Sequence, residues 1–216
     1  MRRDLTNSVL AILVFTVLLG LAYPLATTGL AQVLFPNKAD GSQIERDGKV
    51  VGSRLIGQDF RRPVKGPDGK DKLDADGNPV LEADPRYFQS RPSATGYNPA
   101  ATFFNNLGPN SKKLRTLFEA NLAAYLKLER PYNPGLARGD VPPDAVQTTA
   151  SGVDPHISED NAEIQARRIA KVRGLDLDRV LELVGENTDD RGLGVLGEPG
   201  VNVLELNLAL DDEEGS

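Results

Sequence analysis

Hydrophobic residues dominate the start of the chain without interruption by charge, because no Asp, Glu, Lys or Arg occurs between Asp4 and Lys38. Residues 9–30, the most apolar part, would rise about 33 Å as a helix, which matches the hydrocarbon thickness of a bilayer. The pattern therefore predicts a transmembrane helix at residues 9–30. Arg2 and Arg3 precede it, so the positive-inside rule places residues 1–8 in the cytoplasm and residues 38–216 outside the membrane.

A cleaved signal peptide is the alternative interpretation of the same segment. Arg2 and Arg3 would form its basic region, residues 9–22 its apolar region, and residues 29–31 its small-residue cleavage site. The protein would then be a secreted binding module. Apolar character continues to Phe35, well beyond the roughly 7 to 15 residues that a signal peptide needs, which favours a retained anchor.

Small residues along the anchor predict where another helix could pack. Gly20, Ala22 and Ala26 present little side-chain bulk and allow close approach of a neighbouring helix. Pro24 has no backbone N–H and therefore removes the helical hydrogen bond to the Gly20 carbonyl. These small residues indicate that a helix of another membrane protein could pack against the anchor.

Beyond the anchor, two polar segments are rich in turn signals. Residues 44–51 predict a β-hairpin, because Asp47 and Gly48 supply the positive φ angles of a two-residue turn. Residues 61–86 contain few apolar residues and several Gly, Pro and Asp turns, which predicts an exposed, mobile insertion. Its acidic residues do not fit a calcium loop, because Pro79 occupies the position of the required glycine.

Helical periodicity marks three later segments. The first starts at an Asn110 or Ser111 cap and stops before Pro131, the second runs from a Ser158 cap to Arg173, and the third starts at an Asp176 cap. The second and third are expected to pack as a helical hairpin. In residues 201–210 the leucines alternate, which favours a buried strand over a helix. The expected fold is α+β: one transmembrane helix followed by a single loop-rich extracytoplasmic domain.

Composition narrows the functional classes. The net charge of −6 disfavours nucleic acid as a ligand, and a helix-turn-helix interpretation of the second and third helices fails because the third is strongly acidic. The chain has no cysteine, so disulfides and Cys-based metal sites are excluded. It also lacks a phosphate-binding loop of the Gly-x4-Gly-Lys-Ser/Thr type.

Ser151, Asp154 and His156 include the residue types of a serine-hydrolase triad, and His156 is the single histidine of the chain. They lie within six consecutive residues, whereas triad members converge from separate elements, and no nucleophile elbow surrounds Ser151. Local turn chemistry explains them better. We therefore predict no catalytic residue and no metal site.

Six segments in a fixed order resemble one known family. In one-letter code they are GSRLIGQDF (52–60), YFQSRPSA (87–94), YNP (97–99), NLGP (106–109), TASGVDPHI (149–157) and LGEPGVNVLELNLAL (196–210). Together with the N-terminal anchor they resemble the KdpC family, the C subunits of bacterial Kdp potassium-transporting ATPases. The chain differs from the family pattern mainly at residues 61–86, which look like an extra loop, and at Ser90, where glycine is expected.

This resemblance implies an accessory subunit of an ATP-driven, high-affinity potassium import complex in the bacterial inner membrane. In that family a channel-like A subunit selects potassium, a P-type ATPase B subunit hydrolyses ATP, and a small F subunit joins them in the bilayer. The C subunit helps assemble the pump, with its outer domain over the potassium entrance. It is described as a catalytic chaperone that raises the ATP affinity of the B subunit, and ATP is implied only by that description.

The resemblance assigns no role to eight positions in the family segments, and it leaves any cofactor site unknown. They are Gln58, Arg91, Pro92, Asn98, Ser151, Asp154, Asn202 and Asn207.

Overall fold

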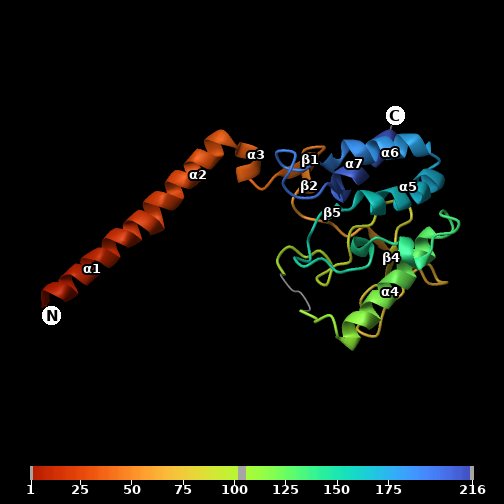
Figure 1. Ribbon diagram of the computed structural model, residues 1–216, viewed down its shortest axis with the longest axis horizontal. Helices are drawn as coiled ribbons and strands as arrows, with labels where there is room; N and C mark the ends of the chain where they lie inside the picture. The colour runs from red at the N-terminus through yellow and green to blue at the C-terminus, as the bar shows by residue number, and fades with distance from the viewer. Residues whose placement is uncertain (1, 102–105, 215–216) are drawn as a thin grey trace. The chain divides into compact units, whose positions relative to one another are not determined.

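The computed structural model describes residues 2–101 and 106–214 (Figure 1). The chain divides into two compact units, Met1–Ser53 and Arg54–Ser216. The described residues combine helices with short antiparallel strands, which confirms the expected α+β class.

The first unit begins with one long helix in three parts: α1 (Arg2–Val17), a π-helical segment η1 (Leu18–Ala22) and α2 (Tyr23–Leu34). It is 33 residues long, its most apolar 18-residue window has a mean hydropathy of 2.5, and none of that window is buried. By length and composition it could cross a membrane. Pro24 explains the π segment, because a proline without an N–H disturbs the α-helical pattern one turn before it.

A short helix, α3 (Pro36–Ala39), connects the long helix to a β-hairpin. Strands β1 (Gln43–Arg46) and β2 (Lys49–Ser53) pair antiparallel with Arg46 opposite Lys49. Between them Asp47 and Gly48 have φ angles of 52° and 72°, which fit a two-residue turn with positive φ at both positions. The predicted hairpin is confirmed.

In the second unit, the insertion is hydrogen-bonded within itself. Strands β3 (Arg61–Pro63) and β4 (Leu81–Ala83) pair antiparallel, and the ladder continues with the Val64 N–H donating to the Val80 carbonyl. Two tight turns follow, closed by bridges between Lys65 and Asp71 and between Leu73 and Pro79. The expectation of an exposed segment is wrong at its end, because Asp84 is only 5% exposed. Its mobility stays a prediction.

The three predicted helices are present with the expected ends. Helix α4 (Lys112–Glu129) is capped by Ser111, whose hydroxyl accepts from the Leu114 N–H. Helix α5 (Glu159–Arg173) is capped by Ser158 and ends at Gly174 in the left-handed conformation. Helix α6 (Leu177–Glu186) is capped by Asp176. Two 3₁₀ turns, η2 (Arg138–Asp140) and η3 (Pro143–Ala145), lie between α4 and α5.

A small antiparallel sheet joins distant parts of the unit in the order β5 (His156–Ile157), β7 (Gly200–Asn202), β6 (Thr188–Asp189). The expected strand over residues 201–210 is wrong beyond Asn202, because α7 (Val203–Glu214) follows at once. The Asn202 side chain accepts from the Glu205 N–H, as an N-cap does. Helix α7 buries Val203, Leu206 and Leu210, a helical spacing that the leucine alternation conceals.

The main core lies where α5, α6 and α7 meet the sheet (Figure 1). Its members are apolar side chains from all four of these parts and from the segment before α4. They are Phe88, Ile157, Ala162, Ala166, Ile169, Ala170, Val180, Leu183, Val184, Val201, Val203, Leu206 and Leu210. A second cluster around Leu122 and Tyr125 packs α4 against η3 and Ile164. Arg168 and Glu129 lie fully buried as well.

Candidate functional site

Charged side chains from five segments form a row of alternating sign, which we call the ionic chain. Arg54 contacts Glu205 at 3.0 Å and Asp189 at 2.5 Å. Asp189 Oδ2 lies 3.0 Å from His156 Nε2. On the other side of the imidazole, Asp154 Oδ1 lies 3.7 Å from Nδ1, and Asp154 Oδ2 accepts from Arg91 at 2.9 Å. The ionic chain thus brings two predicted positions, Arg91 and Asp154, into contact.

The electrostatics of the ionic chain favour a protonated His156. The adjacent Asp154 carboxylate raises the pKa of His156 above 6.5, and Asp189 adds to this effect while partial burial opposes it. The pKa of the Asp154 carboxyl is lowered: burial alone would raise it, but hydrogen bonds from His156 and the charge of Arg91 outweigh that contribution. Each imidazole nitrogen faces a carboxylate, as in a structural ion pair.

Ser151 does not take part in this row among the described residues. Its hydroxyl lies 3.3 Å from the Thr149 hydroxyl and accepts from the Val153 N–H at 3.2 Å. The two ring nitrogens of His156 face Asp154 and Asp189 instead of a serine. The geometry therefore agrees with local turn chemistry and lacks the serine–histidine contact of a hydrolase.

The two asparagines of the last family segment connect α7 to distant backbone. Asn207 is buried, and its amide both accepts from the Phe88 N–H at 2.9 Å and donates to the Phe88 carbonyl at 3.0 Å. Asn202 donates to the Arg54 carbonyl at 2.9 Å while it caps α7. These contacts satisfy backbone groups of irregular segments that have no sheet partner.

The remaining predicted positions act through their backbone or in turns. The Pro92 carbonyl accepts from the Thr149 N–H, and the Gln58 carbonyl accepts from the Ser90 hydroxyl. Asn98 caps a turn by accepting from the Ala100 N–H. These contacts hold the segment around residue 90 against the segments around residues 58 and 150. The structure assigns no chemical task to them.

A close backbone approach explains the glycine of the first family segment. The Gly57 N–H donates to the Val153 carbonyl at 2.7 Å. A Cβ atom at Gly57 would lie 2.6 Å from the Asp154 carbonyl oxygen, a distance that real Cβ atoms do not tolerate. Only glycine therefore lets this strand-like segment lie beside the Asp154 turn.

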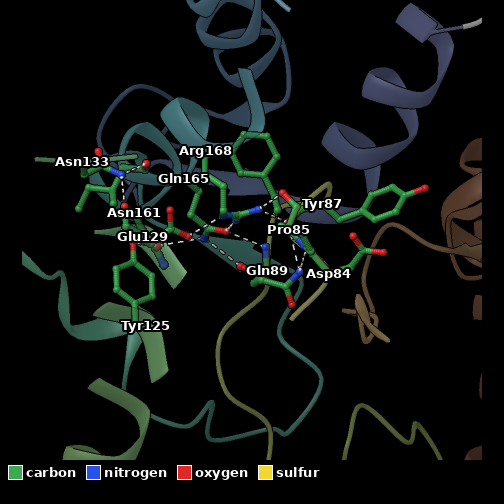
Figure 2. Close-up of polar contacts among 12 residues, drawn as sticks. Asp84, Pro85, Tyr87, Gln89, Tyr125, Glu129, Asn133, Asn161, Gln165 and Arg168 are labelled. Carbon is green, nitrogen blue, oxygen red and sulfur yellow. Dashed lines mark hydrogen bonds and ion pairs between the residues drawn. The ribbon is translucent and has the colours of Figure 1, made fainter. Parts of the chain in front are cut away.

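The second unit also contains a buried polar network centred on α5, which Figure 2 shows. The Arg168 guanidinium donates to Glu129 Oε1 at 2.9 Å, to the Pro85 carbonyl at 2.5 Å and to the Tyr87 carbonyl at 3.1 Å. Gln165 accepts from the Gln89 N–H at 2.7 Å and donates to the Gln89 carbonyl at 3.1 Å. The network joins α4 and α5 to residues 84–89.

Arg168 and Glu129, the ion pair of this network, are both 0% exposed. Burial raises the pKa of the Glu129 carboxyl, and the neighbouring Arg168 charge opposes that rise. Glu129 Oε2 has no hydrogen-bond partner among the described residues. A pair of this kind is a structural element whose disruption is strongly unfavourable, since a lone charge would remain in the core.

Sequence reasoning missed this network entirely. Asn161, Gln165 and Arg168 share one face of α5 at spacings of four and three, and Tyr125 donates to Asn161 at 2.9 Å. A polar stripe on the face that should pack inward was the available signal. It was hidden because polar helix residues usually face solvent.

One loop of the second unit exposes large apolar side chains. Between β6 and β7, the segment of residues 192–197 carries Leu193, Val195 and Leu196, which are 93%, 74% and 62% exposed. The loop is closed by reciprocal backbone contacts between Gly192 and Leu196. We call it the apolar loop. Such a cluster is unusual on a protein surface that faces only water.

Comparison with known proteins identifies the family. The sequence model of "KdpC: K+-transporting ATPase, c chain" matches residues 5–212. The chain belongs to the KdpC family. Potassium-transporting ATPase KdpC subunits similar to it occur in Rhodospirillum rubrum (45% identical, 98% of this chain and 97% of the relative) and Caldanaerobacter subterraneus subsp. tengcongensis (41%, 99% and 97%). The subunit of Myxococcus xanthus is 48% identical over 92% of this chain and 83% of its own length.

KdpC membership fits the geometry of the second unit. The polar side chains of the family segments bind one another and the backbone, as the ionic chain and the two asparagines show. The long exposed apolar helix agrees with a subunit of a membrane transport complex. Membership in the KdpC family connects the chain to potassium transport. The contacts among the family segments hold the second unit together.

Proposed function

We propose that the chain is a non-catalytic accessory subunit of a high-affinity, ATP-driven potassium import complex. It would assemble with the channel-like A subunit, the P-type ATPase B subunit and the small F subunit in the bacterial cell membrane. The observation that carries this proposal is the KdpC match over residues 5–212, joined to a 33-residue apolar helix with no buried face. A helix of this kind needs lipid or another helix around it.

The proposed topology has the N-terminus in the cytoplasm and the second unit outside. Arg2 and Arg3 support it through the positive-inside rule. In this arrangement the second unit never meets cytoplasmic ATP. The raised ATP affinity described for the family would therefore reach the B subunit through subunit contacts in the membrane, without a nucleotide site on this chain.

Exposed apolar surface supports action by assembly. The anchor offers Gly20, Ala22 and Ala26 for close helix packing, and the apolar loop offers Leu193 and Val195 outside the anchor. The charged side chains nearest to a catalytic pattern, Asp154 and His156, are already engaged in the ionic chain. The anchor face and the apolar loop are thus apolar surfaces, as contacts with other subunits favour.

The test compares anchor variants with variants of the triad-like residues. Replacing Gly20 and Ala26 by Leu keeps the anchor hydrophobic, so the chain should insert but recover much less A and B subunit on affinity purification. Ser151→Ala is the matched control and should leave subunit stoichiometry and potassium-stimulated ATPase activity unchanged. A fully assembled, active complex from the Leu variant would overturn anchor docking, and loss of ATP hydrolysis in an assembled Ser151→Ala complex would overturn the non-catalytic role.

A further inference from the structure

The π-helical segment η1 shifts the backbone hydrogen bonding of the long apolar helix. The Tyr23 N–H donates to the Leu18 carbonyl, five residues back, as in a π-helix. In an α-helix that N–H would have reached the Leu19 carbonyl. The next residue, Pro24, has no N–H to offer in its place. The Leu19 carbonyl therefore loses both its α-helical and its π-helical donor.

The nearest hydroxyl group on the C-terminal side does not repair this break. Thr27 Oγ1 lies 3.0 Å from the Tyr23 carbonyl and 3.0 Å from the Pro24 carbonyl, which are later acceptors of the helix. Threonine hydroxyls often satisfy carbonyls that a proline leaves free in membrane helices. Here that compensation serves the turn after the break and leaves the Leu19 carbonyl unserved.

The surface beside the break is open. A Cβ atom added at Gly20 would meet only the Thr16 methyl group, at 3.9 Å. The side chains of Leu18, Leu19 and Leu21 are more than half exposed. We call the Leu19 carbonyl together with the bare Gly20 backbone the carbonyl notch. The Gly20 side of this turn therefore carries little side-chain bulk.

The position of the carbonyl notch limits what can occupy it. Leu19 lies in the middle of residues 9–30, about 15 Å along the helix from either end. At that depth neither headgroups nor bulk water can donate a hydrogen bond to the carbonyl, and lipid tails carry no hydrogen-bond donor. A side-chain donor on another transmembrane helix is the partner that the chemistry fits.

We propose that the carbonyl notch accepts a hydrogen bond from a hydroxyl or amide side chain on a transmembrane helix of another pump subunit. This inference rests on the proposed function and adds its mode of recognition. The small Gly20 surface admits the helix, and the Leu19 carbonyl fixes its register by demanding a donor at one height. Close approach and polarity thus coincide at one turn of the anchor.

The first test removes the notch by restoring an amide. In Pro24→Ala the new N–H can bond to the Gly20 carbonyl, so the Tyr23 N–H can return to Leu19. The anchor should still insert, while recovery of the A and B subunits should fall about three- to tenfold, the effect of one hydrogen bond between membrane helices. Leu25→Ala, which keeps the proline and trims a neighbouring side chain, is the control and should assemble normally. Unchanged recovery for Pro24→Ala would overturn the proposal.

A second measurement separates the hydrogen bond from a change in helix shape. In wild-type chain labelled with ¹³C-carbonyl leucine and ¹⁵N-glycine, the Leu19 carbonyl is the Leu–Gly signal that disappears in Leu19→Ile. Its ¹³C resonance should move downfield when the chain in vesicles joins the complex. An unchanged resonance in an assembled complex refutes the notch alone, whereas failure of the wild-type chain to assemble with the other subunits refutes the proposed function.

Discussion

At the scale of single residues, Arg168 is the largest fully buried side chain among the described residues of the second unit. It is fully buried and donates to Glu129 and to two backbone carbonyls from residues 85–87. Glu129 Oε1 and the Pro85 carbonyl would lose this donor together if the guanidinium were removed. The neighbouring Arg167 on the same helix is exposed and provides a matched comparison.

We expect Arg168→Met to destabilise the second unit by about 3–5 kcal/mol, because it leaves the Glu129 charge buried without a partner. Arg167→Met should change the free energy of unfolding by less than about 0.5 kcal/mol. Near-UV circular dichroism of the detergent-solubilised chain during urea unfolding follows the tyrosines of this unit. Equal midpoints for the two variants would show that the buried pair contributes nothing.

His156 gives the second residue-scale prediction, a dependence of stability on pH. Its pKa in the folded chain is raised above 6.5, so the contacts of the charged imidazole with Asp154 and Asp189 contribute their full stabilisation below about pH 6.5 and lose it as pH rises through the folded pKa. The unfolding midpoint should therefore be lower at pH 9 than at pH 6. The effect should stay under about 1 kcal/mol, because these ion pairs are partly exposed.

Two neighbouring carboxyls supply the control for this pH effect. Asp189→Asn removes a partner of His156 and of Arg54 and should reduce the difference between pH 6 and pH 9. Asp190→Asn, at the adjacent exposed position, should leave it as in the wild type. His156→Gln should abolish it. A full-sized pH difference in the His156→Gln chain would assign the effect elsewhere.

At the scale of elements, the insertion between β3 and β4 has two parts with different roles. Its tip, residues 65–79, is bonded mainly to itself. Its end is part of the domain, because the Pro85 carbonyl binds Arg168 and the Arg86 carbonyl accepts from Arg173 at 2.7 Å. The boundary between dispensable and structural residues lies inside the segment that the sequence marked as one loop.

Replacing residues 65–79 by Asn-Gly should preserve folding. Val64 and Val80 already face each other across the ladder, so a two-residue turn can close the hairpin there. The free energy of unfolding should change by less than about 1 kcal/mol, as for other surface loops. Deleting all of residues 61–86 with a glycine linker should abolish cooperative unfolding, since Arg168 loses the Pro85 carbonyl and Arg173 loses the Arg86 carbonyl. Calorimetry of both variants decides, and a cooperative transition after the larger deletion would contradict this assignment.

At the scale of the whole molecule, retention of the N-terminal helix separates a membrane subunit from a secreted module. If the helix is an anchor, the intact mass of the mature protein includes residues 1–31, and protease added outside spheroplasts digests residues beyond Lys38. The positive-inside rule, applied to Arg2 and Arg3, is the reason to expect this orientation. A mature protein that begins near residue 32, or a second unit protected in intact spheroplasts, would overturn the anchor topology.

The sequence by itself determined the features whose causes are local. The apolar run before Lys38 marks a helix long enough for a bilayer, and Ser111, Ser158 and Asp176 cap helices as their side chains dictate. The Asp47-Gly48 turn follows from backbone conformations that glycine adopts easily. Among the family segments, residue order alone indicated the KdpC family but gave no roles for Arg91, Asp154 or Asn207.

Only the tertiary structure decided the features that depend on distant partners. The alternating leucines after Asn202 favoured a strand, but burial against α5 and α6 selected the helix. Arg168 reads as a surface charge until Glu129 and the Pro85 carbonyl, 39 and 83 residues away, enclose it. The physical reason is that a periodic pattern records which side chains share a face, whereas what that face meets is fixed by contacts between segments far apart in the chain.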